Sequence, residues 1–356
     1  MNIQDTMLRE DFDYITALSI PWEELKGKTL LVTGATGLVG SQIVRAVAYC
    51  NEKYDLHMKV LALIRDPQKA ESLLGSSADN GGIVFLKGDV LQPASEYLPE
   101  IINVDFIVHA ASITASKTMI TQPVETITTA LDGTRNMLEL ARNHHSSAFV
   151  YISSMEVYGS FAEGKYVSEE DMGYIDPLQI RSNYPLGKRM CENMCIAYGA
   201  EYGVPVRIAR LSQTFGAGIL PGENRVFAQF ARSVLNKTDI VLHTKGMSEG
   251  NYCYTRDTVA AILFLLLRGE NNSAYNISNE DCHTTIADMA KMVAHKLAND
   301  EIKVVFDIPE TNQFGYANDT HMKLNASKLR KLGWTPTVGL EEAYRRMIRS
   351  MQETNV

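Results

Sequence analysis

Short apolar runs alternate with segments of helical periodicity along the first 215 residues of the chain. Six of these runs have the length and the content of Val, Ile, Leu and Phe that are typical of strands buried on both faces: 28–34, 59–65, 83–89, 104–112, 149–154 and 206–211. Between several of them, apolar positions recur three or four residues apart, as in 123–143 and 184–202, which predicts helices. Strands that alternate with helices imply a parallel sheet covered on both faces. The pattern therefore predicts an α/β fold with a doubly wound parallel sheet.

The alternation of strands and helices ends near residue 215. We therefore predict one large domain at 28–215, to which segments near 236–267 return, and a smaller C-terminal lobe at 216–356. Residues 1–27 precede the first strand and are predicted to form a short helical extension. The run GSSADNGG at 75–82 predicts a surface loop.

Composition and charge argue against several kinds of protein. With 34 basic against 42 acidic residues and no dense Lys/Arg run, the chain lacks the positive surface of a nucleic-acid-binding protein. The most apolar run, 259–267, is far shorter than the ~20 residues of a membrane-spanning helix, so we expect no membrane span. The first residues carry acids where a signal peptide needs a basic region, which favours a mature cytoplasmic start. Cys191 and Cys195 have no His or Cys pair nearby, so we expect no metal site.

A glycine-rich turn joins the first predicted strand to the first predicted helix. In VTGATGLVGSQ the glycines are Gly34, Gly37 and Gly40. Glycines at this place allow a tight turn and let a diphosphate approach the backbone, and the free amides at the helix N-terminus favour an anion. The strand before the turn and the helix after it favour a dinucleotide site over an ordinary glycine turn. We therefore predict a Rossmann-type domain at 28–215 that binds NAD or NADP, and mainly a substrate-binding lobe at 216–356.

Five motifs together carry a resemblance to a known family. They are GATGLVG at 34–40, GDV at 88–90, HAAS at 109–112, YPLGKR at 184–189 and LGWTPTVGLEEA at 332–343. With these motifs the chain resembles, from about residue 28 to 345, the extended branch of the short-chain dehydrogenase/reductase superfamily, whose members modify nucleotide sugars. The resemblance implies a nucleotide-sugar substrate, a homodimer and a set of cofactor contacts. These contacts are Gly34, Thr36, Gly37, Leu38, Val39, Gly40, Asp89, Val90, Ala110, Ala111, Ser112, Tyr184 and Lys188.

Arg65 follows the second predicted strand, where this branch often has an Asp that binds the ribose hydroxyls and selects NAD. A guanidinium at that position can pair with the additional phosphate of NADP. Asp66 comes next and offers the alternative of a carboxylate turned toward the ribose. The sequence therefore leaves NAD and NADP open, with Arg65 favouring NADP.

Three residues are predicted to serve hydride-transfer chemistry. Tyr184 and Lys188 lie four residues apart on a predicted helix, so their side chains share one face. A tyrosine that removes a proton near neutral pH must lower its pKa from ~10 toward ~7, for which a nearby Lys and a positive nicotinamide ring are suitable sources. The resemblance implies that Ser154 hydrogen-bonds the oxygen that is oxidised and that Lys188 also holds the nicotinamide ribose. Ser153 is the alternative hydroxyl at this strand end.

The resemblance implies that the sugar 4-hydroxyl is oxidised first. Glu156 is the candidate residue for directing the reaction that follows this oxidation. Sugar 4,6-dehydratases have Thr-Asp-Glu at this position and UDP-glucuronate decarboxylases have Thr-Ser-Glu, whereas this chain has Ser154, Met155 and Glu156. Met155 cannot donate a proton, so ordinary dehydration lacks its acid. The alternative is a purely structural role, in which the Glu156 carboxylate only caps or hydrogen-bonds the backbone at the strand end. We rank decarboxylase-like or dehydratase-like chemistry above 4-epimerisation or keto-sugar reduction.

The residues expected to bind substrate match the family only in part. Besides Ser154 they are Gln213, where Asn is common, and Arg225, which matches an Arg that borders the nucleotide. Gly250 occupies the place of an Arg that binds substrate phosphate or carboxylate, and Arg256 is the candidate for supplying that charge. These departures also support a rival interpretation, a catalytically silent NAD(P)-binding regulator. The sequence does not identify the base or the sugar.

Overall fold

A seven-stranded sheet, in which every neighbouring pair of strands is parallel, forms the centre of the molecule. The computed structural model describes residues 4–100, 102–161, 165–309 and 319–354. In spatial order the strands are β11 (Ser273–Ile277), β7 (Val206–Leu211), β5 (Ala148–Ser154), β4 (Phe106–His109), β1 (Thr29–Thr33), β2 (Lys59–Ile64) and β3 (Ile83–Lys87). The chain starts in the middle at β1, runs outward through β2 and β3, and then crosses to β4 and the strands beyond it. This order confirms the predicted doubly wound α/β fold.

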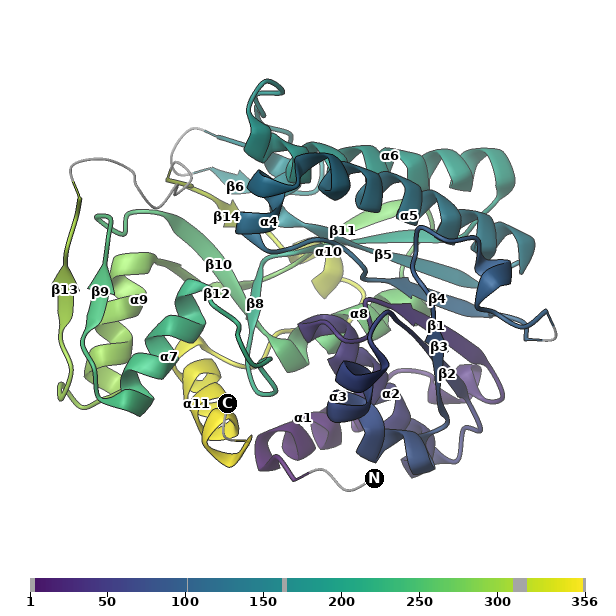
Figure 1. The fold of residues 1–356 in the computed structure, drawn as a ribbon, viewed down its shortest axis with the longest axis horizontal. Coiled ribbons are helices and arrows are strands. Elements are labelled where there is room, and N and C mark those ends of the chain that lie inside the picture. The colour runs from purple at the N-terminus through teal and green to yellow at the C-terminus, as the bar shows by residue number, and fades with distance from the viewer. Residues whose placement is uncertain (1–3, 101, 162–164, 310–318, 355–356) are drawn as a thin grey trace.

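Two helical layers cover the faces of this sheet (Figure 1). One contains α2 (Leu38–Tyr54), α3 (Pro67–Gly81) and α8 (Thr255–Arg268), and the other contains α4 (Ser116–Thr121), α5 (Pro123–Asn143) and α6 (Asn183–Tyr202). Successive residues of β1 serve the two layers, since Leu30 and Val32 belong to the core with α2 and α8, and Leu31 to the core with α5 and α6. A strand buried on both faces needs apolar side chains at consecutive positions, which is why the strands are unbroken apolar runs.

The most apolar run of the sequence lies inside α8. Residues 259–266 are all buried, in the core beneath the sheet. Within the described ranges, no helix combines the length and the apolar content that crossing a membrane requires.

A smaller C-terminal lobe stands beside the central sheet (Figure 1). Its strands are β8 (Gln213–Phe215), β10 (Glu249–Tyr254) and β12 (Asn279–Thr285) in one sheet, and β9 (Ile240–Leu242) paired with β13 (Val304–Phe306). Its helices include α7 (Val226–Asn236), α9 (Ile286–Met292) and α11 (Leu340–Thr354). Two shorter strands, β6 (Tyr166–Val167) and β14 (Lys323–Leu324), pair with each other, and α10 (Ser327–Arg330) follows. Between segments of this lobe, the chain returns to the central sheet through α8 and β11, while the domain limits at 215 and 216 stay a prediction.

The segment before β1 contains the helix α1 (Thr6–Thr16) and a 3-10 turn at Trp22–Leu25. Asp5 caps α1 by accepting a hydrogen bond from the amide of Leu8 at 3.0 Å. Phe12 and Ile15 are almost fully buried in the core that also contains α2, α8 and α11. This N-terminal segment is therefore an integral part of the fold.

The prediction of a loop at 75–82 was wrong, because α3 continues through Gly81. Asp66 caps this helix by accepting hydrogen bonds from two backbone amides of the first turn, and Pro67 occupies its first position. The helix ends at Gly82, whose φ of 71° lies in the left-handed region. A helix begun by a strong cap thus continues through residues of low helix propensity until a glycine ends it.

Candidate active site

A cavity of about 710 Å³ lies between the carboxyl ends of the central strands and the C-terminal lobe. Residues at or just after the ends of β1, β2, β4, β5 and β7 line one side, and Leu220, Glu223, Glu249 and Gly250 are among the residues on the other. Ligands of open α/β sheets bind outside the carboxyl ends of the strands, where the strand order reverses. The position of the cavity is therefore that of a cofactor and substrate site.

The glycine loop after β1 leaves no room for a side chain at Gly34 or Gly40. Gly34 has a φ of 64°, and a Cβ atom there would lie 2.8 Å from the backbone of Ala110. A Cβ atom on Gly40 would lie 2.2 Å from the carbonyl oxygen of Gly34. Gly37 caps α2 without a side chain that binds the first amides of the helix. Close backbone packing and a helix N-terminus without a side-chain cap fit the diphosphate of a dinucleotide.

The cavity brings together every residue that was predicted to contact the cofactor. Those that line it are Gly34, Thr36, Gly37, Leu38, Val39, Gly40, Arg65, Asp89, Val90, Ala110, Ala111, Ser112, Tyr184 and Lys188. They come from loops that are distant in the sequence and adjacent at the sheet edge. Their individual roles stay predictions.

Arg65 and Asp66 point to different partners. Nη1 of Arg65 lies 3.7 Å from a carboxylate oxygen of Asp89, and its side chain is 77% exposed. The carboxylate of Asp66 accepts from the amides of Gln68 and Lys69, so it serves as the cap of α3. The alternative of an Asp66 carboxylate turned to a ribose is therefore not the arrangement found.

Ser154 and Tyr184 meet at the end of β5. Ser154 closes β5 and accepts a hydrogen bond from the amide of Glu156 at 3.2 Å. Burial raises the pKa of Tyr184 to about 12; the negative Glu156 also raises it, while a hydrogen bond with Ser154 and the charge of Arg181 lower it. The phenol is therefore protonated at neutral pH in the protein alone, and a positive charge bound beside it would stabilise the phenolate.

Lys188 lies one helical turn after Tyr184 on α6. Its Nζ atom donates to the carbonyl oxygen of Ile152 at 2.7 Å and lies 5.8 Å from the centre of the Tyr184 ring. Burial lowers the pKa of Lys188 to about 8. The two side chains share one face of the helix, as their spacing predicts.

Ser153, the alternative hydroxyl, belongs to a buried polar network behind β5. It donates to Oε1 of Glu192 at 2.6 Å, and Arg210 binds both carboxylate oxygens of the same Glu192. Arg210 also donates to the hydroxyl of Tyr158 at 3.0 Å. Because its hydroxyl is committed to Glu192, Ser153 is less suited than Ser154 to bind a substrate.

Glu156 is held by an arginine that the sequence motifs did not single out. Nη2 of Arg181 lies 3.1 Å from Oε1 and 3.0 Å from Oε2 of Glu156. Arg181 belongs to the 3-10 turn Ile180–Ser182, directly before α6. Its position three residues before Tyr184 was the signal available in the sequence.

Met155, the residue before Glu156, lies in an apolar cluster. Met155 is buried with Met322 and Leu324, and its Cε atom lies 3.9 Å from the position of a Cβ atom on Gly250. Position 155, where the resemblance gives dehydratases an Asp, and position 250, where it leads us to expect an Arg, are thus adjacent, and neither has a polar side chain here.

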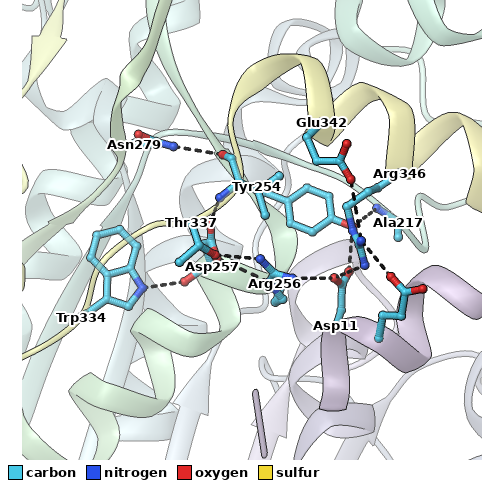
Figure 2. A network of polar contacts seen from close by, with 12 residues as sticks. Asp11, Ala217, Tyr254, Arg256, Asp257, Asn279, Trp334, Thr337, Glu342 and Arg346 are labelled. Carbon is cyan, nitrogen blue, oxygen red and sulfur yellow. Dashed lines mark hydrogen bonds and ion pairs between the residues drawn. The ribbon is translucent and has the colours of Figure 1, made fainter. Parts of the chain in front are cut away.

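Two of the predicted substrate-binding residues line the cavity together with Ser154, and one does not. Gln213 and Arg225 are in the lining, and Nη2 of Arg225 lies 2.6 Å from Oε2 of Glu223. Arg256 is absent from the lining. Figure 2 shows its guanidinium facing Asp11, 3.5 Å from Oδ1, and Nη2 donates to Thr337 at 2.7 Å. Arg256 therefore joins α1 to α8 and does not replace the charge missing at position 250.

The chain is similar in sequence or in fold to known enzymes that act on UDP-glucuronic acid. UDP-glucuronic acid decarboxylase 6 of Arabidopsis thaliana is 29% identical over 321 residues, which cover 88% of this chain and 85% of the relative. UDP-glucuronic acid decarboxylase 1 of Xenopus tropicalis is 28% identical over 322 residues, which cover 90% of this chain and 71% of the relative. A solved structure of UDP-glucuronic acid 4-epimerase from Bacillus cereus, in complex with UDP-glucuronic acid and NAD, has a TM-score of 0.75 and 20% identity, and the match covers 92% of this chain and 99% of that one.

The family model described as the NAD dependent epimerase/dehydratase family matches residues 30–278. These residues include the glycine loop, Ser154, Tyr184 and Lys188. The predicted resemblance to the extended short-chain dehydrogenases/reductases is thereby confirmed. This chain is an enzyme of the NAD dependent epimerase/dehydratase family.

Proposed function

We propose that this enzyme is an NAD(P)-dependent decarboxylase of a nucleotide-linked uronic acid, and that it works through a 4-keto intermediate. The observation that carries the proposal is the position of Glu156 beside Ser154 and Tyr184, next to an apolar Met155. Dehydration needs an acid near the departing hydroxyl, whereas loss of carbon dioxide from a 4-keto uronic acid needs none there. The likeness to two UDP-glucuronic acid decarboxylases over most of the chain supports the same choice.

The proposed mechanism uses proton transfer by the side chains at the end of β5 and the start of α6. Tyr184 takes the proton of the sugar 4-hydroxyl, and Ser154 hydrogen-bonds the same oxygen. NAD(P), whose diphosphate the glycine loop would hold, would accept the hydride from C4 and return it after carbon dioxide has left. When the C5–C6 bond breaks, its electron pair moves toward the C4 oxygen, where Tyr184 and Ser154 donate hydrogen bonds. Glu156 then transfers a proton, replaced from solvent, to C5, and Tyr184 returns its proton to the C4 oxygen.

We expect Glu156→Gln to slow formation of the UDP-pentose from UDP-glucuronate by about 10²- to 10⁴-fold, because the amide cannot transfer the proton that C5 requires after carbon dioxide has left. Oxidation at C4 and loss of carbon dioxide come before this proton transfer, so reduced cofactor should accumulate and the first turnover should still release carbon dioxide. Chromatography of the UDP-pentose, trapped carbon dioxide and cofactor absorbance measure these steps. Glu170→Gln, at an exposed position outside the cavity lining, is the control. Formation of the pentose at the full rate by Glu156→Gln would contradict the assigned role.

A 4-epimerase or keto-sugar reductase is the second candidate function. Gly250 favours it, because the Arg expected at this position of β10 to bind a substrate phosphate or carboxylate is missing, and a neutral sugar has no carboxylate that needs it. A product that keeps its C6 carboxylate but has an inverted C4 would establish epimerisation. No turnover across a panel of UDP-, dTDP-, GDP- and CDP-sugars would favour the catalytically silent regulator.

We propose that the cofactor is NADP, with its additional phosphate between Arg65 and Lys69. Both side chains line the cavity beyond β2, and Asp66 is occupied as a helix cap. The Bacillus cereus epimerase was solved with NAD, so the choice needs a direct test. We expect Arg65→Ala to weaken NADP binding about 10- to 100-fold and NAD binding little, because only NADP carries the phosphate. Fluorescence titration with both cofactors measures this, and tighter binding of NAD by the wild type would contradict the proposal.

Two further expectations stay proposals, namely a homodimer and a cytoplasmic location. The outer faces of α5 and α6 support the first, because Val124, Ile127 and Met190 are exposed there.

A further inference from the structure

The part of the cavity lined by Ser154, Glu156 and Tyr184 is called the reaction end below. It contains an ion pair between Glu156 and Arg181. Both contacts involve Nη2 of the guanidinium, at 3.1 Å and 3.0 Å from the two carboxylate oxygens. The guanidinium carbon lies 5.8 Å from the centre of the Tyr184 ring. One positive and one negative charge thus lie beside the phenol that is expected to face the sugar.

Five cationic side chains belong to the described lining of the cavity: Arg65, Lys69, Arg181, Lys188 and Arg225. Arg65 and Lys69 lie beyond β2, where the additional phosphate of NADP is proposed to bind. Lys188 is almost fully buried and donates to the backbone of β5. Arg225 is bound by a neighbouring glutamate at 2.6 Å. Arg225 uses Nε and Nη2 for that pair, whereas Arg181 uses Nη2 alone for Glu156, so Arg181 keeps more donors for a ligand beside Tyr184.

Among the described residues of the lining, the facing wall supplies no competing cation. Gly250 has no side chain, and the Cε atom of Met155 lies 3.9 Å from the position where a Cβ atom would stand. An anionic group of the substrate in this part of the cavity therefore faces Arg181 as its counter-charge.

Arg181 has hydrogen-bonding capacity beyond its bond to Glu156. Within the described part of the chain, its Nη1 and Nε atoms have no hydrogen-bond partner, and its side chain is 30% exposed. A guanidinium presents five N–H donors in a planar fork and can bind two carboxylates at once. A second carboxylate can therefore bind without breaking the pair with Glu156.

We propose that Arg181 binds the C6 carboxylate of a nucleotide-linked uronic acid and so selects uronic acids over neutral sugars. The inference rests on the proposed function, since it concerns the same site and deepens the substrate class. Arg181 also offsets the repulsion between Glu156 and the substrate carboxylate, because like charges at close range disfavour each other. It is a specificity-determining residue, distinct from the proton-transferring groups Tyr184 and Glu156.

The test compares the binding of UDP-glucuronate with that of UDP-glucose, which has the same nucleotide and a neutral C6. Titration calorimetry of the cofactor-loaded full-length protein in a Tyr184→Phe background, which is expected to bind cofactor but to turn over UDP-glucuronate very slowly, gives both Kd values. We expect Arg181→Gln to raise the Kd of UDP-glucuronate about 10- to 100-fold and that of UDP-glucose less than about 3-fold. Arg181→Lys should recover part of the loss, since it keeps the charge without the planar fork. Adding Glu156→Gln to Arg181→Gln should also restore affinity for UDP-glucuronate, because the unbalanced negative charge is removed.

Arg135→Gln is the matched control, because Arg135 is 58% exposed on α5 and pairs with Asp132 one turn away. It should leave both Kd values unchanged. An equal rise of both Kd values in Arg181→Gln, with Arg181→Lys equally weak, would overturn the proposal in favour of a structural role. Unchanged values, or a wild type that binds UDP-glucuronate no better than UDP-glucose, would also overturn it. Selective binding that depends on Arg181 but yields no carbon dioxide would uphold the inference and refute the decarboxylase.

Discussion

Tyr184→Phe is expected to lower turnover on the true substrate by about 10²- to 10⁴-fold, with folding and cofactor binding retained. The change removes only the phenolic oxygen, while the ring keeps its packing beside Arg181 and Lys188. Without that oxygen, no group of this residue can exchange a proton with the sugar 4-hydroxyl. Steady-state rates of cofactor reduction and of product formation measure the effect.

Tyr198→Phe is the control for the loss of a phenolic oxygen on the same helix. The Tyr198 hydroxyl donates to Glu139 at 2.6 Å, and Tyr198 is not in the cavity lining. Its removal should leave turnover within about 2-fold of the wild type, as expected for a change outside the site. Full turnover by Tyr184→Phe would refute the proposed mechanism, provided that both variants melt cooperatively and bind the cofactor.

The central sheet could be predicted from sequence because strands buried on both faces leave a strong signal. In β1, Leu30 and Leu31 pack into opposite cores, so consecutive positions had to be apolar. The end of α3 left a weaker signal. The residues at 75–82 have low helix propensity, and the cap at Asp66 that begins the helix lies a full helix length away. Local composition therefore indicated a loop where the structure has a helix.

The candidate site was predictable where one short motif supplies both the chemistry and the geometry. Tyr184 and Lys188 needed only a helix between them. Arg181 was missed because its partner Glu156 lies 25 residues earlier and meets it only at the sheet edge. Arg256 was predicted to bind substrate because the residues around it in the sequence resemble a substrate-binding segment. Its side chain turns toward Asp11 instead, which the sequence around it does not indicate.

The N-terminal helix contributes a buried charge that its sequence did not reveal. Asp11 lies on α1 and is 2% exposed. It accepts hydrogen bonds from Nη2 of Arg346 at 2.9 Å and from the hydroxyl of Tyr254 at 2.7 Å, and Arg256 lies 3.5 Å away (Figure 2). Tyr254 ends β10, the strand that begins at Glu249 and Gly250 in the cavity wall. The network therefore ties α1 and α11 to a strand of the substrate side.

Arg346→Met is expected to lower the free energy of unfolding by about 3–5 kcal/mol at pH 8, because it leaves the buried carboxylate of Asp11 without its closest cation. Burial already raises the pKa of Asp11 to about 6, above its ordinary value of 3.8. Loss of Arg346 removes a charge that lowers this pKa, so the pKa in the variant rises further. Denaturant titrations at pH 8 and pH 5 measure the effect.

The pH dependence distinguishes loss of the charge pair from loss of packing. A carboxyl whose pKa is higher in the folded state binds more protons there, so its contribution to stability falls as pH rises from the unfolded to the folded pKa. In the variant this window extends to higher pH, and the destabilisation relative to the wild type should shrink at pH 5, where Asp11 becomes protonated. Arg349→Met is the control, since Arg349 lies on the same helix, is 57% exposed and pairs with Glu353. An equal loss at both pH values would show that Arg346 stabilises α1 and α11 through its packing, and that the charge of Asp11 does not determine how the N-terminal helix is held against β10.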